Sequence, residues 1–374
     1  MSKSKNLFDY LESVKDLSFY DLDLTDLDLL LLAELSYIEL EGLVSPDFKV
    51  SQALRLDDLA PHFSQAQPTA SMGKQDLQLL EAMAQSLRFR SCKVLAFVNH
   101  IIPEKNLQFS ATTYRIKPDY HVLAFRGTDD SIIGWKEDLL LFYQEQLPSQ
   151  KPALAYLKQA LQALTGQMYL TGHSKGGHLA IAAASQLSLE EETRIQLICS
   201  FDAPGHRPHQ LAGPTYQALQ GKIKRFLPQG SLVSQVLPLE EPYQIIACKA
   251  LTSFAQHNPY LWQVKDREFQ LVSQVTRDSL ELKATLNDWL TQTSPRDIQT
   301  LVQLAFDLLL DAEIVTTTSL FDNSFLSKSK EIIRNFCRLT KAEKHLLWRL
   351  SSLLVSLRIR HFYRGITHRW RKKD

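Results

Sequence analysis

The stretch QMYLTGHSKGGHLAIAAASQL, residues 167–187, joins a short apolar strand pattern to an alanine-rich helix pattern through a serine flanked by glycines. Its centre, GHSKG at residues 172–176, has the spacing G-x-S-x-G. In a sharp strand-to-helix turn, side chains two positions before and after the serine would collide with neighbouring elements, so glycine is favoured there. A plain glycine–serine turn has the same five residues. The strand before it and the helix after it favour a nucleophile elbow that exposes the Ser174 hydroxyl.

Strand and helix patterns alternate on both sides of this stretch. Strand patterns precede it in CKVLAFVNH, QFSATTYRIK and YHVLAFRG, and follow it in RIQLICSFDAPG, KIKRFLP and YQIIACK, with amphipathic helix patterns between several of them. This alternation predicts a mostly parallel sheet with helices on both faces. Together with the nucleophile elbow, it fits an α/β-hydrolase fold. We expect an N-terminal helical segment packed on the core (1–75), an α/β-hydrolase core (76–272), and a C-terminal helical region with a basic tail (273–374).

The first of these parts has a helical pattern of its own. DLTDLDLLLLAELSYIELEGLV, residues 23–44, places aspartates at cap positions and apolar residues at helical spacing, and it predicts a helix that ends at Gly42.

The charge of the chain is unevenly distributed. The 374 residues have a net charge of +1, but residues 328–374 hold 14 Lys/Arg against 3 Asp/Glu, which leaves 28 against 38 for the rest. The tail segment LLWRLSSLLVSLRIRHFYRGITHRWRKKD also carries aromatic and aliphatic residues, a combination that favours contact with an anionic membrane. The alternative is a helix packed on the core with a solvated basic end. A nucleic-acid partner is not expected, because no recognisable binding module is present.

Cysteine usage and the N-terminus indicate a cytoplasmic protein. If the tail binds a membrane, the protein is expected at the membrane surface. The four cysteines show no C-x-x-C pairing, which is typical of free thiols in a reducing compartment and makes a metal site unexpected. No apolar run follows the N-terminal lysines, as a signal peptide would require. No cofactor is expected.

A serine hydrolase also needs backbone donors for the developing oxyanion. The strand pattern YHVLAFRG ends in Arg126-Gly127-Thr128, and we expect the backbone N–H groups of Thr128 and Lys175 to be these donors. An ordinary turn at a strand end is the alternative for the first. The Lys175 side chain is expected to have a structural role, such as pairing with Asp129 or Asp130.

FRGTDDSIIGWKEDL, residues 125–139, together with GHSKGG resembles the Mbeg1-like hydrolases, and more distantly the class 3 lipase group of α/β hydrolases. The likeness extends from about Leu27 to about Leu310 and includes SYIELEGLV and QHNPYLWQV. The resemblance implies a lipase-like serine hydrolase.

The general base is expected after the serine and the acid, the chain order of α/β hydrolases. Eleven histidines are available, but most lie too early, within the elbow, or in the basic tail. His257 lies in SFAQHNPYLWQV, on a loop beyond the last predicted strands of the sheet. Chain order and the resemblance select it over the alternative of an ordinary surface-loop histidine.

The position of the acidic residue that should pair with His257 differs from the class 3 lipase pattern. The class 3 lipase pattern implies an aspartate in the loop that here reads RFLPQGSLVSQVLP, where Gly230 or Ser231 stands instead. Asp202 follows the preceding strand and is our choice, although it could simply cap the DAPG turn. Glu240 and Glu241 are further alternatives.

Together these residues predict a carboxylic ester hydrolase, lipase- or esterase-like, acting on acyl esters or lipids through a Ser174–His257–Asp202 triad and an acyl-enzyme. The alternative is a catalytically weak or inactive hydrolase fold that serves as a binding or membrane-associated scaffold. The unusual position of the acid is what supports that alternative.

Overall fold

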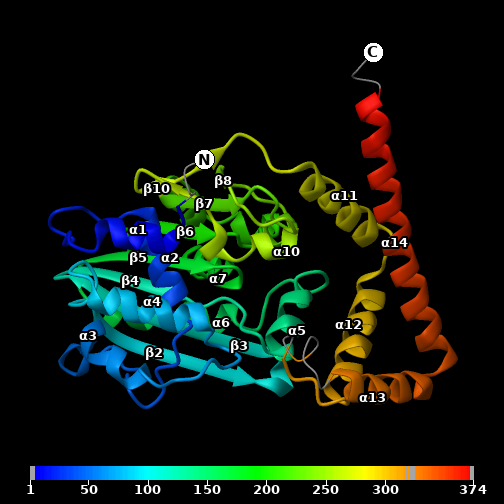
Figure 1. The fold of residues 1–374 in the computed structure, drawn as a ribbon, viewed down its shortest axis with the longest axis horizontal. Helices are drawn as coiled ribbons and strands as arrows, with labels where there is room; N and C mark the ends of the chain where they lie inside the picture. Colours follow the sequence, from blue (N-terminus) through cyan, green and yellow to red (C-terminus); the bar gives the residue numbers. More distant parts are fainter. Residues whose placement is uncertain (1–4, 317–318, 320–324, 371–374) are drawn as a thin grey trace. The chain divides into compact units, whose positions relative to one another are not determined.

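The computed structural model describes residues 5–316, 319 and 325–370, and these form two compact units. Unit 1 combines Met1–Asp129 with Pro148–Val275, and unit 2 combines Asp130–Leu147 with Thr276–Asp374. Figure 1 shows the sheet of the first unit and the helices of the second. No helix within the described ranges has the length and apolar character needed to cross a membrane.

Unit 1 is built on a nine-stranded sheet with the order β1-β2-β3-β4-β5-β6-β7-β8-β11. Strands β4 to β8 run parallel, whereas β1 to β4 pair antiparallel and β11 is antiparallel to β8. The predicted fold class is confirmed, with the refinement that the sheet is mixed. The strands are β1 Leu54–Arg55, β2 Lys93–Ile102, β3 Leu107–Lys117, β4 Tyr120–Phe125, β5 Gln167–His173, β6 Ile195–Phe201, β7 Ile223–Pro228, β8 Tyr243–Ile246 and β11 Leu271–Val272, with a separate hairpin of β9 Val264–Lys265 and β10 Glu268–Phe269.

Both faces of this sheet are covered by helices, because its central strands are apolar on both sides. Successive residues of β4 alternate between two cores. Val122 and Ala124 face the core that includes α1, α2 and α4, while Leu123 and Phe125 face the core that includes α6, α7 and α9. The helices of unit 1 are α1 Leu7–Val14, α2 Asp26–Leu35, α3 Leu56–Leu59, α4 Lys74–Gln85, α6 Gln150–Ala163, α7 Lys175–Ala184, α8 Leu189–Glu192, α9 Pro214–Leu219 and α10 Ser253–Gln256.

Helix α2 is shorter than its sequence pattern predicts. It begins at a capping box, in which Thr25 and Asp28 satisfy each other's backbone N–H groups. It ends at Leu35 rather than near Gly42, and the Ser36 hydroxyl donates to the carbonyl oxygen of Ala33 at 2.6 Å. Residues 36–44 form turns, bends and extended backbone instead of further helix, and the Tyr37 hydroxyl lies close to Gly127, which follows β4.

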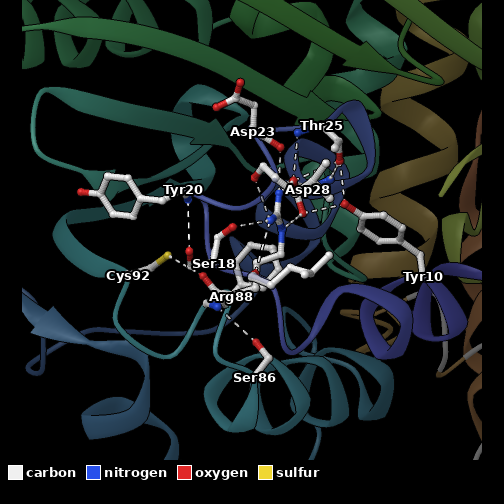
Figure 2. A network of polar contacts seen from close by, with 12 residues as sticks. Tyr10, Ser18, Tyr20, Asp23, Thr25, Asp28, Ser86, Arg88 and Cys92 are labelled. Atoms are coloured by element: carbon white, nitrogen blue, oxygen red, sulfur yellow. Dashed lines mark hydrogen bonds and ion pairs between the residues drawn. The ribbon is translucent and has the colours of Figure 1, made fainter.

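An ion pair inside the protein fastens α2 to the segment that follows α4. Arg88 and Asp28 are both fully buried, and the Arg88 guanidinium donates to both carboxylate oxygens of Asp28, with the Nε–Oδ1 distance at 2.8 Å. Figure 2 shows this pair at the centre of a polar network. The guanidinium also donates to the carbonyl oxygens of Leu22 and Asp23, and Tyr10 donates to Asp28 at 2.8 Å. The buried charges are therefore matched and hydrogen-bonded, as burial requires.

Unit 2 is helical and has its own apolar core. Its helices are α5 Ile132–Leu140, α11 Arg277–Thr291, α12 Pro295–Leu310, α13 Phe325–Arg338 and α14 Lys341–Trp370. Trp289 of α11 packs in this core with Phe306, Leu350 and Leu357. The Trp289 indole N–H donates to the carbonyl oxygen of Leu350 at 3.0 Å, which ties α11 to α14.

Candidate active site

Ser174 lies at the sharp turn between β5 and α7. Its φ of +56° and ψ of −132° are a backbone conformation that costs a non-glycine residue about 1–3 kcal/mol. Two glycines make the turn possible: a Cβ on Gly172 would lie 2.3 Å from the carbonyl carbon of Gly176, and a Cβ on Gly176 would lie 1.9 Å from the carbonyl oxygen of Phe125. The predicted strand–serine–helix turn is thus present, and the close approach of its backbone explains both glycines.

The Arg126-Gly127-Thr128 turn lies directly against the serine. A Cβ on Gly127 would be 3.2 Å from the Cβ of Ser174 and 2.3 Å from the hydroxyl oxygen of Tyr37. Thr128 lies three residues beyond the end of β4, and Lys175 is the first residue of α7. Both predicted oxyanion donors therefore belong to segments that border Ser174.

The Lys175 side chain points away from solvent into unit 1. It is fully buried, and its ammonium donates to the backbone and side-chain oxygens of Gln108 at 3.0 and 3.1 Å. Asp129 contacts Arg126 at 3.5 Å and accepts a hydrogen bond from Ser71 at 2.9 Å. These contacts anchor the start of α7 and the end of β4.

The structure brings Asp202 and His257 together. The His257 Nδ1 lies 2.7 Å from Asp202 Oδ2. Asp202 follows β6, is buried, and donates its backbone N–H to the carbonyl oxygen of Phe226 at 2.7 Å. The His257 side chain is 20% exposed. A carboxylate at Nδ1 favours the tautomer that has a proton on Nδ1 and a free lone pair on Nε2, the arrangement required of a general base.

Ser231, which occupies the position where the class 3 lipase pattern implies an acid, hydrogen-bonds Asp202 instead. Its hydroxyl donates to Asp202 Oδ1, the oxygen that does not face His257. Ser234 in turn donates to Ser231 at 2.5 Å. Of the alternative acids, Glu241 is buried in an ion pair with Arg225 at 2.6 Å, and Glu240 is exposed.

The loop that carries His257 is held to the end of β7. The Gly230 N–H donates to the side chain of Gln256 at 2.7 Å, and the Trp262 indole N–H donates to the carbonyl oxygen of Gln256 at 2.8 Å. Because Gln256 immediately precedes His257, these two bonds fix the backbone next to the imidazole.

His173 forms a second histidine–carboxylate pair beside the first. Its Nδ1 lies 3.2 Å from Glu34 of α2, its Nε2 lies 3.0 Å from the carbonyl oxygen of His257, and the two imidazole rings are 4.5 Å apart. Burial opposes a charge on His173, but the Glu34 carboxylate and the hydrogen bond to His257 outweigh it and raise the pKa of His173. His257 is therefore held at its side chain by Asp202 and at its backbone by His173. Sequence analysis missed Glu34, because nothing in its sequence position links it to residue 173.

Asp76 lies in the same buried neighbourhood. Burial, followed by the nearby Glu34 carboxylate, raises its pKa to about 7. Its carboxyl accepts hydrogen bonds from the Tyr260 hydroxyl at 2.9 Å and from the backbone N–H of Gly73 at 2.7 Å. Tyr260 comes from the His257 loop, so α2, α4 and this loop meet around one set of acidic groups.

Two further histidines are structural. The rings of His178 and His206 stack at 4.1 Å. All four ring nitrogens have partners: Gln150 and the Gly205 carbonyl for His178, and the His178 carbonyl and Arg225 for His206. Burial lowers the pKa of His178 to about 4, and it lowers the pKa of His206 well below the usual range of histidine, so both are neutral near pH 7.

The four cysteines of the chain are not among the predicted site residues. Cys92, Cys199 and Cys248 are buried free thiols, as predicted, and Cys337 is a free thiol that is exposed. In the described part of the chain, no three His, Cys, Asp or Glu side chains are grouped as metal ligands would be.

The chain is similar to several solved lipase structures, but the similarity is weak. A fungal lipase structure is 15% identical, covers 76% of this chain and 95% of its own, and has a TM-score of 0.40. A mutant form of MDLA from Penicillium cyclopium is 16% identical, with 69% and 88% covered and a TM-score of 0.40. A Rhizomucor miehei lipase–propeptide complex is 15% identical, with 68% and 76% covered and a TM-score of 0.35. Identities and TM-scores this low assign no activity to the chain.

No curated protein sequence matches the chain. The model of one family, described as Mbeg1-like, matches residues 83–307, which is more than half of the chain and includes the elbow, Asp202 and His257. The protein therefore belongs to the Mbeg1-like family.

Proposed function

We propose that the protein is a serine hydrolase of carboxylic esters, similar to lipases and esterases. The single observation that carries this proposal is the buried Asp202 at 2.7 Å from His257, whose ring lies 4.5 Å from that of His173, the residue before the strained elbow serine. A serine turn alone is common, but a histidine oriented by a buried carboxylate beside it is the arrangement that activates a hydroxyl.

In the proposed reaction, the Ser174 Oγ attacks the acyl carbon while His257 Nε2 takes the hydroxyl proton. The backbone N–H groups of Thr128 and Lys175 bind the oxyanion. The imidazolium, stabilised by Asp202, then gives its proton to the leaving alcohol oxygen, and the C–O bond of the ester breaks. The same imidazole then deprotonates a water molecule, which attacks the acyl carbon. The bond between this carbon and Ser174 Oγ breaks, the imidazolium returns the proton to Ser174, and the carboxylic acid is released. No metal or cofactor takes part.

We assign an acyl ester, such as an acyl lipid, as the substrate class. Leu251 and Phe254, which shortly precede His257 on its loop, are large apolar side chains that are strongly exposed. Exposed apolar side chains next to a catalytic group favour contact with an apolar part of the substrate over a purely polar one.

A fluorophosphonate probe tests the nucleophile, because it reacts covalently with an activated serine. Wild-type protein and the Ser185→Ala control are expected to be labelled, whereas Ser174→Ala is not. Ser185 is a suitable control because it lies at the end of the same helix, where its hydroxyl donates to the carbonyl oxygen of Ile181 at 2.7 Å. Absence of labelling in folded wild-type protein would contradict the proposal and leave the non-catalytic scaffold as the explanation.

A further inference from the structure

Helix α14 has apolar residues on two opposite faces. One face packs into the core of unit 2, where Leu350 and Leu357 are fully buried. At 100° per residue, these two side chains are on the same side of the helix. The inner face therefore accounts for the attachment of α14 to α11 and α12, and it leaves the apolar residues of the opposite face unexplained.

The outer face carries a stripe of large apolar side chains, spaced seven, four and three residues apart, which places them on one side of the helix. Its members are Trp348, Val355, Ile359 and Phe362, which are 69%, 58%, 51% and 52% exposed. A row of exposed side chains of this size is unusual for a surface that meets only water. Helix α13 adds two more exposed apolar side chains, Ile333 and Phe336.

The charge of α14 indicates what meets this stripe. Residues 341–370 contain seven Lys/Arg and a single Asp/Glu, Glu343. Lys341 continues the line of the stripe at the start of the helix, and Arg360 lies beside it; both residues are exposed. Arg349 also lies beside the stripe, but its guanidinium is ion-paired with Asp297 of α12 at 2.8 Å. A second copy of α14 would bring a like charge to the same surface, which opposes self-association. A layer of phosphates, in contrast, matches both the sign and the spread of these cations.

We propose that α14 docks on an anionic phospholipid bilayer. The helix lies along the membrane surface, with Trp348, Val355, Ile359 and Phe362 at the boundary between headgroups and acyl chains. Lys341 and Arg360 then lie at the lipid phosphates. The opposite face stays packed in unit 2. This inference does not depend on the proposed hydrolase activity, because it concerns binding alone.

Co-sedimentation with vesicles tests the proposal with the full-length protein. We expect binding to vesicles of phosphatidylcholine with phosphatidylglycerol, weaker binding to phosphatidylcholine alone, and loss of binding at high salt. Ile359→Glu should weaken the binding roughly ten-fold or more, since an aliphatic side chain that would be buried in the bilayer is replaced by a charge. Leu280→Glu is the matched control: Leu280 lies on α11 of the same unit, is 52% exposed against 51% for Ile359, and undergoes the same change of charge.

Two results would overturn the proposal. Failure of the wild-type protein to sediment with anionic vesicles would do so, and light scattering that showed a dimer dissociated by Ile359→Glu would then identify a second copy as the occupant of the stripe. Equal loss of binding in Ile359→Glu and Leu280→Glu would also contradict it, because the stripe would then have no special role.

Discussion

At the scale of single residues, the candidate site is defined by what holds His257. Asp202 contacts its side chain, His173 contacts its backbone carbonyl, and each of these partners is itself held, by Ser231 and by Glu34. A histidine that is fixed at both its side chain and its backbone needs little change of position when it receives a proton. Such preorganisation favours general-base catalysis.

Asp202→Asn is expected to lower kcat for ester hydrolysis by roughly 10³–10⁴-fold, because an amide no longer fixes the required tautomer or stabilises the imidazolium. Steady-state kinetics on a soluble ester measures this effect, and circular dichroism checks that the variant folds. Glu240→Gln serves as the control, since Glu240 is an exposed alternative acid. If Asp202→Asn keeps wild-type turnover, the assignment of Asp202 is wrong.

Asp76 should make stability depend on pH. Its pKa of about 7 in the folded protein is above the ordinary value of 3.8, so the folded state keeps a proton that the unfolded chain releases. The free energy of unfolding should therefore fall as pH rises from about 4 to 7, by up to about 1.4 kcal/mol per pH unit from this group. The groups facing it are Glu34, His173 and Tyr260.

Urea unfolding at several pH values tests this dependence by comparing wild type with Asp76→Asn. The stability of the wild type relative to the variant should be greatest near pH 4, decrease up to about pH 7 and level off above it. Asp58→Asn, which changes an exposed aspartate, should leave the slope unaltered. A wild-type slope that Asp76→Asn does not change would show that another group controls the pH dependence.

At the scale of elements, the attachment of α2 matters most, because this helix carries Glu34 to the site. Arg88→Met would leave the Asp28 carboxylate buried without its partner, and should lower the free energy of unfolding by roughly 3–5 kcal/mol. Chemical denaturation measures the change. Combining it with Asp28→Asn should recover part of the loss, because no uncompensated charge then remains.

The partly exposed pair Arg55–Asp57 offers a comparison for this prediction. Arg55→Met removes a salt bridge at the surface, where such pairs contribute about 0–1 kcal/mol. If Arg88→Met costs no more than Arg55→Met, the buried network of Figure 2 does not secure α2.

The elements also show what the sequence could predict. Period-two and period-3.6 patterns identified the central strands and the helices between them, and the glycine spacing identified the elbow. They failed at β1 and β11, since two residues are too short for a pattern. The end of α2 was misplaced because residues after Leu35 are used for contacts with other segments, such as that of Tyr37 with Gly127.

At the scale of the whole chain, the site combines segments that are far apart in sequence. The glycine spacing pointed to Ser174, and chain order with the family resemblance pointed to His257. Chain order left Asp202, Glu240 and Glu241 as alternative acids. It could not reveal Glu34 or Asp76, which lie before residue 83, where the family match begins. Their approach to His173 and Tyr260 results from helix packing, which leaves no periodic signal in the sequence.

The parallel pairing of β6 with β7 has a consequence for judging whether a hydrolase of this kind is intact. Neighbouring strands that run the same way end at the same edge, so Asp202 after β6 and Ser231 after β7 touch each other. The two positions are adjacent in space, and in this chain the carboxylate that contacts His257 comes from the first of them. The absence of an acidic residue at the position of Ser231, after β7, is therefore no evidence that a related chain lacks a carboxylate for its histidine. The position of Asp202, after β6, has to be inspected as well.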